Sequence, residues 1–244
     1  MQPDQLLLVF LGALAGGFVN GLTGFGTGIT AMGPWLYALS PPVAASLVII
    51  CSIISQLQTL PMIWRAIEWS RVLPFVVPGL LGVPIGTWLL PQVDPRAFKL
   101  GVGLFLIAYS SYVLARRGQS RSPWGGRAAD GAVGFGGGVL GGLTGFSGVP
   151  AIVWTDIRGW TKEQRRSVLQ GFNIAILSAA LASHLVSGLL TREVGLATVA
   201  ALPGTFAGAW AGALVYMRLG NRGFQKVVMG LLFMSGLALI WTSR

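Results

Sequence analysis

Two short stretches of this 244-residue chain place hydroxyl and amide side chains among glycines, inside segments that are otherwise apolar. The first is NGLTGFGTG at residues 20–28, and a near copy, GGLTGFSGV, follows at residues 141–149. Glycine lets a ligand approach the backbone closely, and the hydroxyl and amide side chains between the glycines can donate hydrogen bonds. We interpret the two stretches as the halves of one binding site for a small oxyanion.

Each stretch interrupts a predicted membrane helix, and the interruption itself indicates a polar site. In hydrocarbon, irregular backbone is tolerated only where it is buried in protein or lines a polar cavity. A helix that starts again after such a break has unpaired N–H groups and a partial positive charge at its N-terminus. Two breaks that face each other near the membrane midplane would therefore bring donors together around an anion.

The candidate substrate-binding residues come from both breaks and from two further predicted spans. They are Asn20, Gly21, Thr23, Gly24, Gly26, Thr27, Gly142, Thr144, Gly145, Ser147 and Gly148 in the breaks, and Gln56, Gln170 and Asn173 in the spans. For the three span residues, hydrogen bonding between helices explains their polarity equally well. His184 is the candidate for proton coupling, with a packing role as the favoured alternative. Asp156 beside Arg158 is the candidate gate, with an ordinary loop ion pair as the favoured alternative.

Charged side chains are absent from the middle of every predicted span. The seven acidic residues lie at or near segment ends, and no Lys or Arg lies deeper. No carboxylate is therefore available there to hold a cation or relay protons, so backbone N–H groups, hydroxyls and amides are expected to form the site. The chain has one cysteine, no cluster of metal ligands and no nucleotide-binding loop. We predict no metal, no cofactor and no enzyme activity.

The composition is that of an integral membrane protein. Hydrophobic residues make up 53% of the chain and charged residues only 10%, whereas a soluble domain carries about 25% charged residues. The net charge of +10 lies in short loops, which is how Lys and Arg orient a membrane protein. The expected partners are thus a lipid bilayer and a small anion, without nucleic acid, and a homodimer is left open. Apolar stretches long enough to cross about 30 Å of hydrocarbon occur near residues 5–22, 42–64, 72–93, 97–115, 168–190, 196–217 and 224–242.

The chain contains an internal duplication. A shift of 121 residues aligns GGFVNGLTGF (16–25) with GGVLGGLTGF (137–146), and seven of these ten positions are identical. A shift of 126 aligns the small-residue motifs GVPIG (82–86) and GAWAG (208–212), for which we predict close helix packing. We expect one membrane domain, residues 1–244, in which repeat 1 covers about 5–115, a basic cytoplasmic linker 116–127, and repeat 2 about 128–243.

The distribution of basic residues predicts that the two repeats are inverted. If each break is the bend of a re-entrant hairpin, thirteen of the 17 Lys and Arg residues face the same side as the linker, among them Arg165 and Arg166 in a loop. If each broken segment crosses once, the division is eight against nine. The positive-inside rule favours the first arrangement. We therefore predict an all-α integral membrane protein with about eight membrane helices in two inverted repeats, each opening with a broken hairpin, and both termini in the periplasm.

The first stretch, GGFVNGLTGFGTGITAMGPWL (16–36), resembles the first-half signature of the TauE/SafE sulfite exporter family, also called the toluenesulfonate uptake permease family. The second, GGLTGFSGVPAIVW (141–154), is similar to the second-half form, and the resemblance covers nearly the whole chain. The residues in register are Gly21, Gly24, Gly26, Gly28, Pro34 and Leu36, and then Gly142, Gly145, Gly148 and Pro150. Thr27 and Ser147 replace glycines of the signature, so the family's substrates carry over only as a class.

The resemblance implies transport of a sulfur-containing anion, of the sulfite, sulfonate, sulfoacetate or thiosulfate class, across a bacterial inner membrane. A secondary transporter that works by alternating access is the preferred interpretation, because inverted repeats are a common construction of such proteins. An anion channel and a non-transporting membrane scaffold are the alternatives.

Overall fold

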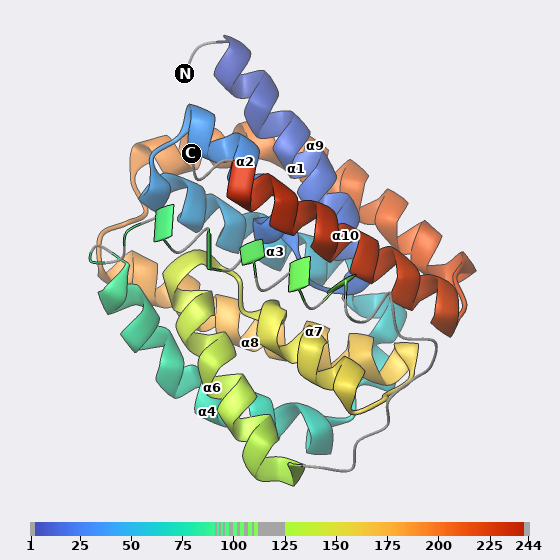
Figure 1. The fold of residues 1–244 in the computed structure, drawn as a ribbon. Coiled ribbons are helices and arrows are strands. Elements are labelled where there is room, and N and C mark those ends of the chain that lie inside the picture. The colour runs from blue at the N-terminus through green and yellow to red at the C-terminus, as the bar shows by residue number, and fades with distance from the viewer. Residues whose placement is uncertain are drawn as a thin grey trace.

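The computed structural model describes residues 3–90 and 125–241, and between them residues 92, 94, 96, 97, 100, 101, 103, 104, 107, 108, 110 and 111. Within these residues the chain is all helical and contains no strand (Figure 1). The first half contains α1 (Pro3–Thr23), α2 (Thr27–Ala38), α3 (Pro41–Ile63), the 3-10 turn η1 (Trp64–Ala66) and α4 (Trp69–Leu89). The second half contains α6 (Gly126–Thr144), α7 (Gly148–Ile157), α8 (Lys162–Val186), α9 (Arg192–Arg218) and α10 (Asn221–Trp241).

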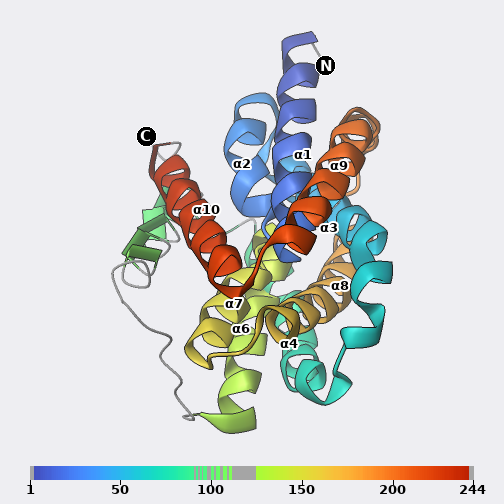
Figure 2. The same cartoon turned by 90° about the vertical axis from the view of Figure 1, so that its right-hand side faces the viewer.

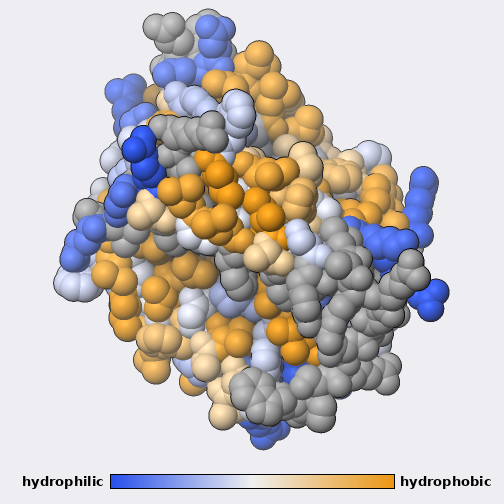
Figure 3. Space-filling view, in the orientation of Figure 1, coloured by the Kyte–Doolittle hydropathy of each residue, from blue (hydrophilic) through white to orange (hydrophobic). Residues whose placement is uncertain are grey.

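Six of the described helices are long and apolar enough to cross a membrane, namely α1, α3, α4, α8, α9 and α10. They correspond to six of the seven predicted stretches. The seventh, 97–115, is described only in part, and residues 116–124 of the predicted linker lie outside the described residues. Large apolar side chains such as Leu81, Trp88 and Trp210 are exposed, and Figure 3 shows apolar residues over much of one face with hydrophilic ones toward its margins. The chain is a multi-pass membrane protein.

The two predicted helix breaks are present. Helix α1 ends at Thr23 and α2 begins at Thr27, and the break between them contains Gly24 and Gly26 with φ of 81° and 98°. The second break, between α6 and α7, contains Gly145 with φ of 76°. Residues with side chains rarely adopt such positive φ values, so glycine is what allows the backbone to turn at both breaks. In Figure 2, α1 and α6 begin at opposite ends of the molecule and both breaks lie between those ends.

Reciprocal packing joins the two halves: α1 lies against α9, and α6 lies against α4. A side chain at Gly21 would overlap the carbonyl of Ala209, and one at Gly142 would overlap the carbonyl of Val83. The shift of 121 relates the two glycines, and the shift of 126 relates Val83 to Ala209. The same correspondence holds for three further pairs of close approaches: Gly17–Thr205 with Gly138–Gly79, Gly208–Leu14 with Gly82–Phe135, and Gly212–Phe18 with Gly86–Val139. The prediction that GVPIG and GAWAG mark close helix packing is confirmed.

Helix α8 begins earlier than predicted, at Lys162 rather than near residue 168. Thr161 and Gln164 form a capping box, in which each side chain bonds the other residue's backbone N–H, and this motif starts the helix. The basic residues Arg165 and Arg166 therefore lie inside α8 and are buried. The prediction that they belong to a loop is wrong.

Candidate functional site

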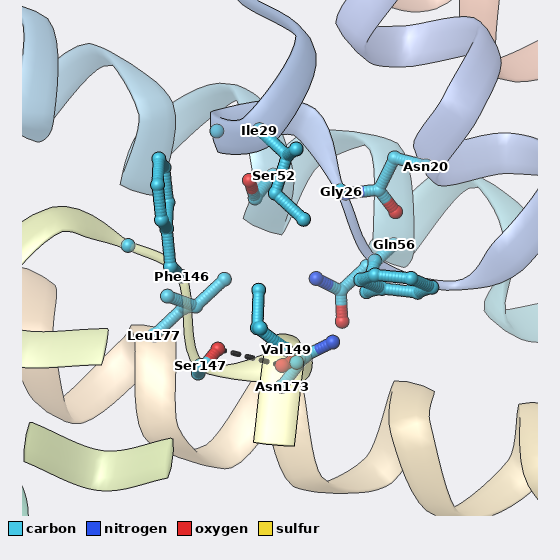
Figure 4. Close-up of a pocket in the computed structure, with 14 residues that line it drawn as sticks. Asn20, Gly26, Ile29, Ser52, Gln56, Phe146, Ser147, Val149, Asn173 and Leu177 are labelled. Atoms are coloured by element: carbon cyan, nitrogen blue, oxygen red, sulfur yellow. Dashed lines mark hydrogen bonds between the residues drawn. The ribbon is translucent and has the colours of Figure 1, made fainter. Parts of the chain in front are cut away.

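A cavity with an empty volume of about 230 Å³ lies where the two breaks meet (Figure 4). The free centre of this space is narrow, with room for about one water molecule. Elements from both halves line it. The lining residues are Asn20, Phe25, Gly26, Gly28, Ile29, Ser52 and Gln56 from the first half, and Gly145, Phe146, Ser147, Gly148, Val149, Asn173 and Leu177 from the second.

The two breaks touch each other through their phenylalanines. A side chain at Gly148 would meet Cβ of Phe25 at 2.7 Å, and a side chain at Gly28 would overlap the ring of Phe146. Phe25 and Phe146 occupy the same position of the repeated motif, 121 residues apart. The shift of 121 also relates two further pairs of lining residues, Ser52 with Asn173 and Gln56 with Leu177. The cavity is therefore built from corresponding positions of the two halves.

Asn173 of α8 connects the breaks by hydrogen bonds. Its Oδ1 accepts from Ser147 Oγ at 2.6 Å, and its Nδ2 donates to the carbonyl of Gly24 at 3.1 Å. Asn20 stabilises the first break in a similar way, because its Nδ2 donates to Thr27 Oγ1 at 2.7 Å. These bonds hold both turns in place although no regular helix passes through them.

Two described lining residues have unused hydrogen-bonding capacity: Asn20 through its Oδ1 acceptor, and Gln56 through both polar atoms of its amide. The Gln56 side chain is fully buried, and neither Nε2 nor Oε1 has a hydrogen-bond partner. Its backbone carbonyl accepts from Gln170 Nε2 at 2.8 Å. The contact to α8 is thus made by the backbone of Gln56, and the side-chain amide stays unpaired. Figure 4 shows this amide at the side of the cavity, between Asn20 and Asn173. A buried polar group without a partner is costly and indicates a missing ligand or water.

The electrostatic character of the cavity comes from helix ends rather than from full charges. None of the lining residues within the described part of the chain is ionisable. Helices α2 and α7 both begin at the cavity, and neither first turn is capped by a side chain. Helix N-termini carry about half a positive charge and unpaired N–H groups. The cavity therefore suits an anion that is bound reversibly.

Half of the predicted substrate-binding residues line this cavity, and half do not. Lining it are Asn20, Gly26, Gln56, Gly145, Ser147, Gly148 and Asn173; outside it lie Gly21, Thr23, Gly24, Thr27, Gly142, Thr144 and Gln170. Thr23 is buried, and its hydroxyl bonds the carbonyls of Val19 and Phe25, so it shapes the turn. Thr144 Oγ1 donates to the carbonyl of Leu140 at 3.1 Å. Of the residues outside the cavity, Gly21 and Gly142 serve the helix packing described above.

The candidate coupling and gating residues lie away from the cavity. His184 is fully buried, with Nδ1 3.0 Å from Ser46 Oγ and Nε2 3.2 Å from the carbonyl of Gly142, which agrees with the packing alternative. Asp156 lies 2.7 Å from Nη1 of Arg165, whereas Arg158 lies 3.9 Å from Asp130. The structure thus gives Asp156 a partner other than the predicted Arg158.

Sequence reasoning missed several residues of the site. Ser52 aligns with Asn173 under the same shift of 121 that aligns the breaks, and applying that shift beyond the glycine motifs would have found it. Phe25 and Phe146 were part of the repeated GF motif but offered no polar chemistry. Arg166, whose guanidinium is buried beside the first break, was hidden by its apparent position in a loop.

Among protein families, the model described as Sulfite exporter TauE/SafE matches residues 8–239 of the chain. Comparison with curated proteins and with solved structures gives no match. Within the described residues, no group of three or more His, Cys, Asp and Glu side chains is placed to hold a metal ion.

Proposed function

The chain belongs to the sulfite exporter TauE/SafE family of membrane transporters, and we propose that it carries a small sulfur-containing anion through the cavity between its two breaks. The family makes it a transporter of a small anion and not an enzyme. The proposed substrates are anions of the sulfite, sulfonate, sulfoacetate or thiosulfate class, and the proposed location is the bacterial inner membrane with both termini in the periplasm.

The observation that carries the proposal is the free amide of Gln56 at the point where α2 and α7 both begin. The amide is buried and has no partner, and two uncapped helix N-termini border the same space. An oxyanion placed there would accept from Gln56 Nε2 and from N–H groups of the helix ends, and it would satisfy donors that otherwise stay unpaired.

The chemistry of the lining favours a weakly basic oxyanion. Neutral donors and helix dipoles bind an anion less tightly than an ion pair between that anion and a buried arginine would. A transporter must release its substrate again, so the weaker binding suits transport. Ser147, which replaces a glycine of the family signature, gives its hydrogen bond to Asn173. Thr27, the other replacement, receives one from Asn20. Both hydroxyls therefore adjust the shape of the cavity. We infer that the family determines the class of anion, and that this shape determines which anion of the class is transported.

Alternating access is the proposed mechanism. The cavity holds only about one water molecule, so a sulfur oxyanion fits only after the surrounding helices separate. The reciprocal packing of α1 with α9 and of α6 with α4 supports two inverted repeats, with about eight membrane helices in all, that move against each other around the site. An open channel would need a continuous path, and the narrow cavity argues against that alternative.

The test is flux in proteoliposomes that contain the purified protein. Labelled sulfite, sulfoacetate or thiosulfate should enter with saturation, and unlabelled anion on the opposite side should accelerate its entry. A channel would show neither effect. If none of these anions is transported with saturation by protein that is folded and oriented in the bilayer, the proposal fails.

A further inference from the structure

Arg166 lies beside the first break, on the side of the cavity toward the start of α8. Its side chain is fully buried, and a side chain built on Gly24 would lie 3.7 Å from its Cγ. One guanidinium nitrogen, Nη1, donates to the carbonyl of Leu22 at 2.6 Å. The guanidinium carbon lies 4.0 Å from the centre of the Tyr216 ring. The charge is thus held next to the substrate cavity without lining it.

The guanidinium of Arg166 lacks a counter-ion within the described residues. Its Nε and Nη2 atoms are buried and have no hydrogen-bond partner, and no carboxylate of those residues lies within ion-pair distance of it. The neighbouring Arg165, by contrast, lies 2.7 Å from Asp156. Arginine does not lose its proton in proteins, and a buried charge without a partner is strongly unfavourable. The site is therefore incomplete without an anion.

A purely structural role explains only part of this arrangement. Leu22 contributes one of the last four carbonyls of α1, and a cation at a helix C-terminus is favourable. The Tyr216 ring also stabilises the cation. These interactions leave the Nε–Nη2 edge unused, and this edge is the one that binds two oxygens of an oxyanion side by side. The shift of 121 places Ala45 at the corresponding position of the first half, so the repeated fold does not require an arginine here.

We propose that Arg166 is a second anion-binding site, where the substrate binds on its way between the central cavity and the end of the molecule at which α8 begins. Arg166, Gln170 and Asn173 lie on one face of α8 at spacings of four and three residues, and Asn173 reaches the cavity. Arg166 and Asn173 are about 10 Å apart along the helix at 1.5 Å per residue. The anion would give up neutral donors in the cavity and gain a bidentate bond to the Nε–Nη2 edge.

This inference rests on the proposed transport function and is tested by comparing three variants in the flux assay. Arg166→Gln should raise the half-saturating concentration of the transported anion about 10- to 100-fold, the loss expected for charged hydrogen bonds. Arg166→Lys should recover part of it, because the charge remains while the bidentate edge is lost. Arg165→Gln is the matched control: it removes a buried guanidinium that already has a carboxylate, and it should change the half-saturating concentration less than threefold.

The outcomes separate the two proposals. A wild-type protein without saturable transport contradicts the proposed function itself. Wild-type transport together with an unchanged half-saturating concentration in folded Arg166→Gln contradicts only the role of Arg166. An equal rise of the half-saturating concentration in Arg166→Gln and Arg165→Gln would also contradict the role of Arg166, because a general effect on packing would then be the cause.

A second measurement on the unaltered chain decides the matter if Arg166→Gln does not fold. Crystals of the wild-type protein soaked in selenite, whose selenium scatters X-rays anomalously, would show where the anion binds. The expected result is a selenium peak within hydrogen-bond reach of Arg166 Nε and Nη2, in addition to one in the cavity. A peak in the cavity alone, or no peak at Arg166, would overturn the inference.

Discussion

Replacing Gln56 by leucine separates the binding role of this residue from a structural one, because the two roles predict opposite effects on stability. The Gln56 side chain is fully buried and its amide has no partner. Gln56→Leu therefore removes no side-chain hydrogen bond of the folded protein. The backbone carbonyl that accepts from Gln170 remains, and leucine already occupies the corresponding position, 177, of the second half.

The expected magnitudes follow from these contacts. Removing an unpaired buried polar group relieves about 1–3 kcal/mol of desolvation cost, so the midpoint of thermal unfolding should rise by about 2–4 °C per kcal/mol. The bound anion loses one hydrogen bond between a neutral donor and its own charge, about 1.5–3 kcal/mol, which weakens its binding roughly 10- to 150-fold. The variant should be more stable and bind more weakly.

Ser55→Ala is the matched control for this change. Ser55 is also fully buried on α3 with an unpartnered hydroxyl, but it does not line the cavity. It should leave anion affinity unchanged and unfold no earlier than the wild type. Calorimetric titration with sulfite, thiosulfate, sulfoacetate and a short sulfonate measures the affinities, and thermal unfolding of the same samples measures stability. Unchanged affinity of Gln56→Leu for every anion that the wild type binds, or a loss equal to that of Ser55→Ala, would show that the Gln56 amide does not bind the anion.

Four further substitutions test how the breaks are held. Asn173→Ala leaves Ser147 and the Gly24 carbonyl without their partner; it should cost about 1–3 kcal/mol of stability and lower the transport rate, and unaltered unfolding would show that the bridge is unimportant. Thr23→Val removes a hydroxyl that donates toward the carbonyls of Val19 and Phe25 and accepts from the Phe25 N–H. Thr144→Val removes one donated bond of a less buried residue. The thermal midpoint should fall more for Thr23→Val, and the reverse order would count against the assignment. Gly24→Leu must adopt φ near 81°, which costs about 1–2 kcal/mol, and its side chain points at Arg166; flux should be abolished, and normal flux in a folded variant would contradict this.

The sequence was sufficient to predict the features that recur in both halves. The breaks and the glycine packing motifs each appear twice, and their recurrence separates them from the background of a glycine-rich membrane protein. Six spans could be predicted from apolar length alone, because a helix in hydrocarbon must be about 20 residues long. These features depend on local sequence and its repetition, not on the details of tertiary packing.

Other features depend on packing between distant segments, and these could not be predicted. Whether the Gln56 amide has a partner is decided by where Gln170 binds, which is the backbone carbonyl of Gln56 rather than its side chain. The sequence predicts that Thr23 faces the anion, but its hydroxyl lies within hydrogen-bond distance of the carbonyls of Val19 in α1 and Phe25 in the break. Hydropathy alone puts the start of α8 near residue 168 and Arg166 in the preceding loop, whereas the capping box at Thr161 starts the helix at Lys162.

Binding of a sulfur oxyanion between the two breaks can be tested by locating the bound anion. In crystals of the wild-type protein soaked in selenite, we expect an anomalous selenium peak between α2 and α7, within hydrogen-bond reach of Gln56 Nε2. A protein that transports the anion in proteoliposomes, but whose crystals show selenium bound elsewhere and nothing between the two breaks, would contradict this expectation.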